Sequence, residues 1–398
     1  MTEIVRKPRG RLFFANPGPT NIPDSIMHAV AHVSVDWYPA EFMAVYEECR
    51  AGLKRVMKTD NDLVFHTGSG HAAWESALVN LFSPGDLLLY PQAGNFSDRW
   101  GAMARDLGLR TQVIECDWRR GVELAEVKAA LAADKAHEIK AVCVTHNETS
   151  TGMTLDPRDF RAMLDATSHP ALLLVDTISS LACMDFHNDD WGVDCAVGGS
   201  QKGLMLPTGL SFNTISKKAW EASKQSTLPK SYFSWANMMK LPHKSFMGTP
   251  PTSLFYGMQE SLRLLLEEEG LENVFARHTR LASAVRCAVN QWAGNGGPQL
   301  FCLNPSRYSD SVTTVLVPEG YDANKVRSVA LDRFNVSLGG GLARLAGKAF
   351  RIGHLGDLNE PMVLGALAAV ELSLKVAGVP YSNGGVDAAI AYLAENRQ

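Results

Sequence analysis

Short runs of apolar residues recur through the first half of the chain, and most are followed by a small polar turn and a stretch with helical spacing. A continuous apolar run of this length fits a strand that is buried on both faces. Strands that alternate with helices predict a mainly parallel sheet in an α/β domain. The expected strands span residues 63–66, 86–90, 110–115, 141–145, 171–175 and 194–197. The expected helices between them span residues 72–81, 97–107, 123–133 and 157–166, and an earlier amphipathic helix ends near residue 58.

The alternation stops at residues 231–252, which are irregular and rich in aromatic side chains. This stretch ends in Gly248-Thr249-Pro250-Pro251 and suits a segment that reaches across a dimer interface. A long helix at residues 254–269 follows, and residues 313–317 predict a strand beyond it. The pattern therefore predicts three parts, which are an N-terminal arm at residues 1–22, a large domain at 23–270 and a smaller α+β domain at 271–398.

The N-terminal arm is extended because residues 13–23 contain three prolines and a glycine, which exclude a helix interior. Two interpretations stay open for it. The segment is either a simple leader or an arm that lies across a neighbouring surface, near a ligand.

The composition is that of a globular protein, with 46% hydrophobic and 20% charged residues in 398. The net charge of −4 carries no basic excess for a nucleic-acid partner. No apolar run is long enough to span a bilayer, and no signal peptide is visible. The seven cysteines are scattered without a CxxC pair. We therefore expect reduced cysteines in a cytoplasmic protein, with no metal site and no membrane partner.

The first candidate for a ligand site follows the strand at 63–66, where Thr67-Gly68-Ser69-Gly70-His71 leads into a helix. Free N–H groups and the helix dipole converge at such a turn and favour an anion. The turn lacks the Gly-Lys-Ser/Thr of a P-loop and the GxGxxG of a dinucleotide site, which argues against a dehydrogenase. The alternative is that the glycines serve packing alone.

Two residues carry stronger chemistry. Asp176 directly follows five apolar residues of a buried strand, where a carboxylate is costly to hold unless a cation pairs with it. Lys202 lies on the small-residue turn Gly198–Gly203 at the end of another strand. An amine there can form a Schiff base with an aldehyde if its surroundings lower its pKa.

Five candidate residues each lie just beyond a strand end: Ser69, Phe96, Thr149, Asp176 and Lys202. Ligands bind parallel α/β sheets at the carboxyl ends of the strands, so one cleft can hold all five. They supply an anion cradle, a stacking face, a hydroxyl, a buried acid and an amine. This set matches pyridoxal 5′-phosphate, whose ring serves as an electron sink when its nitrogen is protonated.

The chain also resembles a known family, the fold-type I, class V aminotransferases of the alanine–glyoxylate and serine–glyoxylate group. The resemblance runs from Asn16-Pro17-Gly18-Pro19-Thr20 to the segment at 350–356 and covers nearly the whole chain. Its most specific motifs are Ser69-Gly70-His71, His146-Asn147-Glu148-Thr149, Val175-Asp176 and Ser200-Gln201-Lys202-Gly203.

The resemblance implies a role for each matching residue at the cofactor ring. Lys202 matches the Schiff-base lysine, and Asp176 matches the partner of the pyridinium nitrogen. Phe96 occupies the position of the stacking aromatic residue, and Thr149 that of the hydroxyl near the phenolic oxygen.

At the phosphate, the resemblance implies a homodimer whose active site lies at the subunit interface. Thr249 matches a phosphate ligand that the other subunit donates. Phe246 stands where some relatives carry a tyrosine, and it cannot make that hydrogen bond. The matching phosphate contacts within the subunit are Ser69, Gly70, His71 and Gln201.

For the substrate, Arg351 matches the arginine that binds the α-carboxylate, a role that also suits its planar bidentate fork. One departure concerns the segment Asp36-Trp37-Tyr38-Pro39. Close serine–glyoxylate relatives carry His-Arg-Ser after the aspartate, so Trp37 and Tyr38 would make the substrate pocket bulkier or more apolar.

The expected activity is transfer of an amino group from serine or alanine to glyoxylate by a ping-pong mechanism. The alternatives are another donor or acceptor, such as aspartate or pyruvate, and a PLP-dependent lyase or desulfurase. A desulfurase needs a mobile cysteine, for which Cys302 is the nearest candidate. A binding protein without turnover is a further alternative, which the presence of Lys202, Asp176 and Arg351 disfavours.

Overall fold

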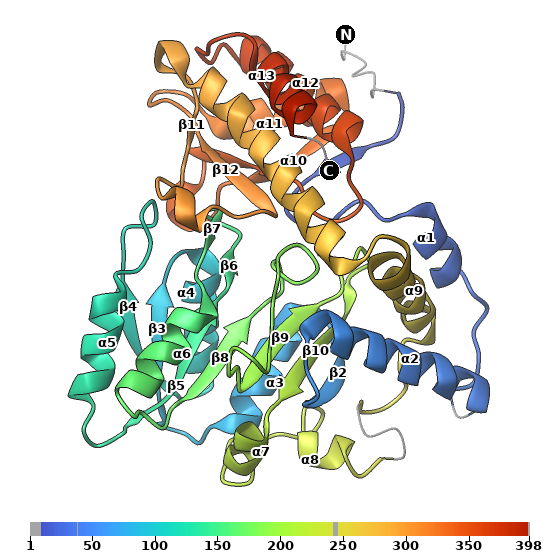
Figure 1. Cartoon of the computed structure of the whole chain (residues 1–398), viewed down its shortest axis with the longest axis vertical. Coiled ribbons are helices and arrows are strands. Elements are labelled where there is room, and N and C mark those ends of the chain that lie inside the picture. The colour runs from blue at the N-terminus through green and yellow to red at the C-terminus, as the bar shows by residue number, and fades with distance from the viewer. Residues whose placement is uncertain (1–8, 38, 242–245, 397–398) are drawn as a thin grey trace, which may run out of the picture.

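The computed structural model describes residues 9–37, 39–241 and 246–396, and its centre is a seven-stranded sheet. The strands lie in the order β2-β10-β9-β8-β5-β3-β4 (Figure 1). Neighbouring strands are parallel except for β10, which runs antiparallel to β2 and to β9. The bounds are β2 (Asp62–Gly68), β3 (Leu87–Gln92), β4 (Arg110–Glu115), β5 (Ile139–Thr145), β8 (Leu172–Asp176), β9 (Cys195–Gly199) and β10 (Gly209–Ile215).

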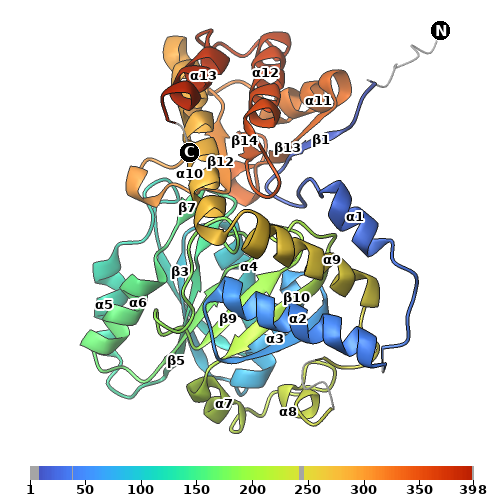
Figure 2. The same ribbon diagram turned by 45° about the vertical axis from the view of Figure 1, so that its right-hand side comes forward.

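Both faces of this sheet are buried, as the apolar runs predict. Along β5, Val142 and Val144 belong to one hydrophobic cluster, whereas Ala141 and Cys143 belong to another on the opposite face. Helices lie around the sheet (Figure 2). Their buried side chains belong to one cluster or the other. The first cluster includes α2 (Ala40–Met57), α5 (Leu124–Ala133), α6 (Pro157–Ala166) and α9 (Thr252–Arg263). The second includes α3 (Gly70–Leu81), α4 (Asn95–Asp106), α7 (Lys217–Ser223) and α8 (Trp235–Met238).

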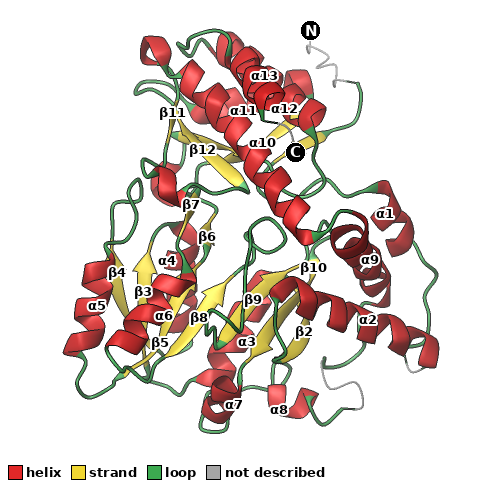
Figure 3. Ribbon diagram, in the orientation of Figure 1, coloured by secondary structure: helices red, strands yellow, loops and turns green. Residues whose placement is uncertain are grey.

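A second sheet of five strands carries its own hydrophobic core and lies above the first in Figure 3. Its strand order is β1-β13-β14-β12-β11. The strands are β1 (Phe13–Ala15), β11 (Gln299–Leu300), β12 (Val312–Leu316), β13 (Val336–Gly340) and β14 (Ala349–Gly353). The helices packed with it are α10 (Leu271–Trp292), α11 (Ala323–Phe334), α12 (Glu360–Ala377) and α13 (Gly385–Glu395).

Residues 13–15 of the predicted arm belong to this smaller sheet, because β1 pairs in parallel with β13 and Ala15 lies in its core. This part of the arm is therefore a packed edge strand. The strand β10 is absent from the sequence-based prediction, although its sequence alternates apolar and polar residues as an antiparallel strand does. The long helix predicted at 254–269 is confirmed as α9, which continues into a π-helical turn at Leu264–Glu268. The domain limits at 22/23 and 270/271 stay predictions.

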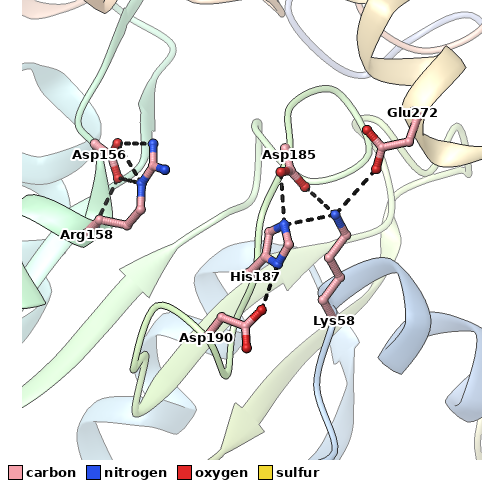
Figure 4. A network of polar contacts seen from close by, with 7 residues as sticks. All are labelled: Lys58, Asp156, Arg158, Asp185, His187, Asp190 and Glu272. Carbon is pink, nitrogen blue, oxygen red and sulfur yellow. Dashed lines mark hydrogen bonds and ion pairs between the residues drawn. The ribbon is translucent and has the colours of Figure 1, made fainter.

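A polar network at the surface joins the end of α2 to the start of α10 (Figure 4). The Lys58 ammonium donates to Asp185 Oδ1 at 2.7 Å and lies 3.6 Å from Glu272. His187 bridges Asp185 and Asp190 beside it, at 3.0 Å from each. Exposed ion pairs of this kind contribute at most about 1 kcal/mol each, so the network supplements the apolar packing. None of the helices in the described part of the chain combines the length and apolar character needed to cross a bilayer.

Candidate active site

A cavity of about 110 Å³ lies at the carboxyl ends of β2, β5, β8 and β9 and gathers most of the predicted site residues. Its lining residues are Gly70, His71, Trp74, Phe96, Asn147, Thr149, Asp176, Ile178, Ser179, Gln201 and Lys202. A larger cavity of about 600 Å³ lies between α1 (Asp24–Val30), α2 and α9, but none of the predicted residues lines it. The chemistry therefore places the candidate site in the smaller cavity.

The anion-binding end of the cavity is the start of α3, where the first N–H groups of a helix lack partners within the helix. Ser69 is the N-cap residue, and Gly70 and His71 form the first turn. A Cβ on Gly70 would overlap the end of the Ile178 side chain, so a larger residue at this position would require Ile178 to move. Gln201 Oε1 and His71 Nε2 are buried without a hydrogen-bond partner in the described part of the chain, which leaves them available to a ligand.

Asp176 ends β8 inside the cavity and is held by two neutral donors. Its Oδ1 accepts from the Ile178 amide at 2.8 Å, and its Oδ2 accepts from Trp74 Nε1 at 3.1 Å. No ion pair to Asp176 occurs among the described residues, contrary to the expectation of a paired cation. Burial raises the pKa of Asp176 to about 7. The carboxyl group is therefore available to a cationic group of a ligand.

Lys202 lies on the turn after β9, with its side chain directed to the N-terminal arm. Its Nζ donates to the carbonyl oxygen of Pro17, and a Cβ on Gly18 would overlap its side chain. Burial, and then the nearby positive charge of Arg351, lower the pKa of Lys202 to about 8. A substantial fraction of the amine is unprotonated near neutral pH, which nucleophilic attack on an aldehyde requires.

Phe96 and Thr149 enter the cavity from two adjacent segments. Phe96 lies in the first turn of α4, and Thr149 follows the short strand β6 (Asn147–Glu148). The Thr149 hydroxyl is 2.8 Å from Ser179 Oγ, which also accepts from Asn147 Nδ2 at 2.8 Å. These hydroxyl and amide groups form a polar part of the cavity lining.

Arg351 comes from the smaller sheet, in the middle of β14, and is 8% exposed. Its Nε donates to Gly340 O at 2.8 Å and its Nη1 to Thr149 O at 3.2 Å. Burial lowers the pKa of Arg351 to about 10, so the guanidinium stays charged at neutral pH. Its Nη2 makes no hydrogen bond to the residues that the structure describes.

Two predicted residues, Trp37 and Thr249, do not line this cavity in the same chain. Thr249 is exposed just before α9, and Trp37 packs edge-on against Phe246 with ring centroids 5.7 Å apart. Tyr38 lies outside the described residues. The roles predicted for Thr249, Trp37 and Tyr38 stay predictions.

Sequence reasoning missed four lining residues: Trp74, Asn147, Ile178 and Ser179. Trp74 follows His71 by three positions on α3, and this helical spacing places both on the same face. Asn147 belongs to the polar cluster before Gly152, where its amide donates to Ser179 and to Ser311 across the junction of the two sheets. Its Oδ1 is buried without a partner in the described part of the chain.

Comparison with known proteins yields a consistent set of relatives. The family model "Aminotransferase class-V" matches residues 12–343. A serine–glyoxylate aminotransferase of Hyphomicrobium methylovorum is 46% identical, over 96% of this chain and 94% of that protein. An L-aspartate–glyoxylate aminotransferase of Paracoccus denitrificans is 44% identical, over 94% of each. The crystal structure of pyridoxamine–pyruvate aminotransferase from Mesorhizobium loti superposes with a TM-score of 0.89 at 27% identity, over 98% of each chain.

The raised pKa of Asp176 predicts a pH-dependent effect of Asp176→Asn on the cofactor-free protein. The folded wild type binds a proton at Asp176 up to about pH 7, whereas the unfolded chain releases it near the usual value of 3.8. The Asp176 contribution to stability is therefore present below pH 3.8 and is lost as the pH rises to 7. The variant lacks this loss, so the difference in free energy of unfolding, variant minus wild type, should increase by on the order of 2 kcal/mol from pH 5 to pH 8. Urea unfolding at both pH values measures it, and a difference independent of pH would contradict the assignment.

Proposed function

Because the chain belongs to the class-V aminotransferases, we propose that it transfers the amino group of a small L-amino acid, with serine as the preferred donor, to glyoxylate. The observation that carries the proposal is the meeting of Lys202 and Asp176 in one cavity, with Arg351 bonded to its wall. The two relatives compared above share glyoxylate in their names but differ in donor. The names of these relatives therefore support glyoxylate as the acceptor more directly than serine as the donor.

The residues of the cavity fit pyridoxal 5′-phosphate, the cofactor of this family. Within the described residues, the His71 ring and the Gln201 amide each keep a buried polar atom without a partner, and their N–H groups can donate to a phosphate. Asp176 forms no ion pair with the described residues and can pair with a ring nitrogen. When bound, this cofactor supplies an electron-accepting ring that stabilises negative charge at the substrate α-carbon. The residues that would hold it are Ser69, Gly70, His71, Phe96, Thr149, Asp176, Gln201 and Lys202.

Lys202 would have two tasks. Its amine would hold the cofactor aldehyde in the resting enzyme, and its Nζ would carry the proton away from the substrate α-carbon once the substrate has displaced it. A pKa lowered to about 8 suits a general base that works near neutral pH.

Asp176 would keep the ring nitrogen protonated through a charge-assisted hydrogen bond. The Trp74 and Ile178 donors hold the carboxyl group in place, so no reorientation is needed when a ligand arrives. Arg351 would bind the substrate carboxylate with the part of its guanidinium that makes no hydrogen bond to described residues. Its Nε and Nη1 are held by backbone carbonyls, which fix the direction of the fork.

A homodimer would complete the site. Thr249 is exposed and does not line the cavity of its own chain within the described residues, as a phosphate ligand donated to a partner subunit requires.

A desulfurase is the second candidate, and the state of Cys302 disfavours it. Cys302 is buried, and burial raises the pKa of its thiol, so the thiolate that sulfur transfer needs is scarce. A sulfide-release assay with L-cysteine separates the two activities.

Lys202→Ala should reduce kcat for transamination at least about 10³-fold, because the variant loses both the covalent anchor and the proton carrier. Borohydride treatment of the wild type with pyridoxal 5′-phosphate should add the cofactor mass to the peptide that contains Lys202. Mass spectrometry of the digested protein tests this, with Lys217→Ala on the surface helix α7 as the control. Labelling of another lysine, or an active Lys202→Ala variant, would overturn the proposal.

Arg351→Ala should raise the KM for amino acid and for glyoxylate by about 10- to 100-fold, because a charged hydrogen-bonded pair is lost. Arg351→Lys should recover only part of the loss, since an ammonium cannot reproduce the bidentate fork. Steady-state kinetics with both substrates measures the effect. An unchanged KM in Arg351→Ala would remove this residue from the substrate site.

The donor is identified by kcat/KM for L-serine, L-alanine and L-aspartate with glyoxylate as acceptor. We expect serine to exceed alanine by about 3- to 10-fold, the value of one hydrogen bond to its hydroxyl group. A preference for aspartate would instead align the chain with the aspartate–glyoxylate relative. Turnover with none of the three would contradict the proposed substrate class.

A further inference from the structure

A buried carboxylate that the proposed chemistry does not use lies beneath the first turn of α4. Glu148 is 0% exposed and receives five hydrogen bonds. Its Oε2 accepts from the amides of Phe96 and Ser97 at 3.0 Å each, and from Ser97 Oγ at 3.3 Å. Its Oε1 accepts from the Ser150 amide at 3.1 Å and from Ser150 Oγ at 2.6 Å.

These contacts give α4 the cap that its own sequence lacks. The N-cap residue is Gly94, which has no side chain to accept the first N–H groups of the helix. Glu148 accepts two of them, and Ser150 Oγ accepts the third, from Asn95, at 2.9 Å. A negative group at this end of a helix is also favoured by the helix dipole.

The backbone around Gly94 is shaped for this carboxylate. A Cβ on Gly94 would overlap the Glu148 side chain and would come within 2.5 Å of Ser150 Oγ. The absence of a side chain at this position therefore lets α4 begin directly against Glu148. Figure 1 shows the neighbouring elements α4 and β6.

Two segments that contact Glu148 reach the candidate site: the helix α4 and the turn that contains Glu148 itself. The helix that it caps carries Phe96 into the cavity, and its own chain neighbours Asn147 and Thr149 also line the cavity. The carbonyl of Thr149 in turn accepts from Arg351. One carboxylate thus joins the stacking residue, the ring-facing hydroxyl and the substrate-binding arginine.

We propose that Glu148 is a positioning residue for the cofactor ring. Glu148 holds Phe96 and Thr149 at a fixed separation in the cavity. This inference rests on the proposed function, because it concerns the ring that the cavity would bind. Glu148 acts through the backbone of α4 and of its own turn.

The hydrogen bonds around Glu148 require a carboxylate, and a neutral side chain of the same size would not satisfy them. Every group within hydrogen-bonding distance of Glu148 is a donor, so the amide nitrogen of Glu148→Gln would face N–H and O–H groups. Either the donors at the start of α4 or those of Ser150 then lose their acceptor. In both cases the start of α4, which carries Phe96, is no longer held against the turn that contains residue 148.

The test compares two ligands of the cofactor-free protein, pyridoxal 5′-phosphate and inorganic phosphate. Glu148→Gln should raise the Kd of pyridoxal 5′-phosphate at least about tenfold, the cost of about one charged hydrogen bond. The Kd of phosphate should stay within about twofold, because the start of α3 is not altered. The visible circular dichroism of the bound cofactor should fall by about half or more, since that signal requires a fixed ring.

Asp194→Asn is the matched control, because Asp194 is also a buried carboxylate in the large sheet. It accepts from the Leu173 amide at 2.9 Å and from Ser216 Oγ at 3.0 Å, before the start of β9 and at the opposite end from the cavity. It should lower the melting temperature without changing either Kd or the dichroism. If Glu148→Gln does not fold, Gly94→Ala replaces it as the test variant. The added methyl group displaces the Glu148 carboxylate without removing its charge. Gly94→Ala should therefore show the same loss of visible dichroism.

A foldable Glu148→Gln variant with wild-type Kd and dichroism would overturn the inference. If that variant does not fold, wild-type behaviour of Gly94→Ala would overturn it instead. Failure of the proposed function shows itself in the wild type alone, as an absence of cofactor binding or of turnover. The two failures are therefore distinguishable.

Discussion

The site depends on one electrostatic constraint, a carboxyl group buried at the end of a central strand that forms no ion pair with the described residues. Asp176 is held by an indole and an amide, and burial raises its pKa to about 7. Lys202, the nearest candidate cation, donates instead to Pro17. The carboxyl group is therefore kept in a position where a protonated ring nitrogen can satisfy it, and the cofactor-free protein bears the cost of that preorganisation.

Both sheets are needed to build this site. The large sheet supplies Asp176 and Lys202, whereas Arg351 and the Pro17 carbonyl belong to segments of the smaller one. The contact from Asn147 to Ser311 closes the junction next to the cavity. Because each contact crosses between the sheets, a change in their relative position would alter Lys202 and Arg351 together.

The class-V aminotransferase fold explains the reaction type better than the choice of donor. In the proposed function, the residues around the cavity would bind a cofactor and a substrate carboxylate, and every amino-acid donor carries that carboxylate. Trp37 packs on Phe246 away from the cavity of its own chain. Discrimination between serine and aspartate would then depend on surfaces that the proposed dimer brings together, and not on the chemistry around Lys202.

The sequence by itself determined the six parallel strands of the large sheet and the residues at their ends, because such strands leave a simple apolar pattern and end at one shared edge. Phe96, Thr149, Asp176 and Lys202 followed from that rule. The sequence did not predict the antiparallel strand β10. The approach of Arg351 to the same edge entered only through the family resemblance, since its strand lies in another sheet. Trp74, Ser179 and Glu148 were decided by the tertiary structure. Trp74 donates to a residue 102 positions away and Glu148 caps a helix that begins 53 positions earlier, and such partners are chosen by packing, which local pattern does not encode.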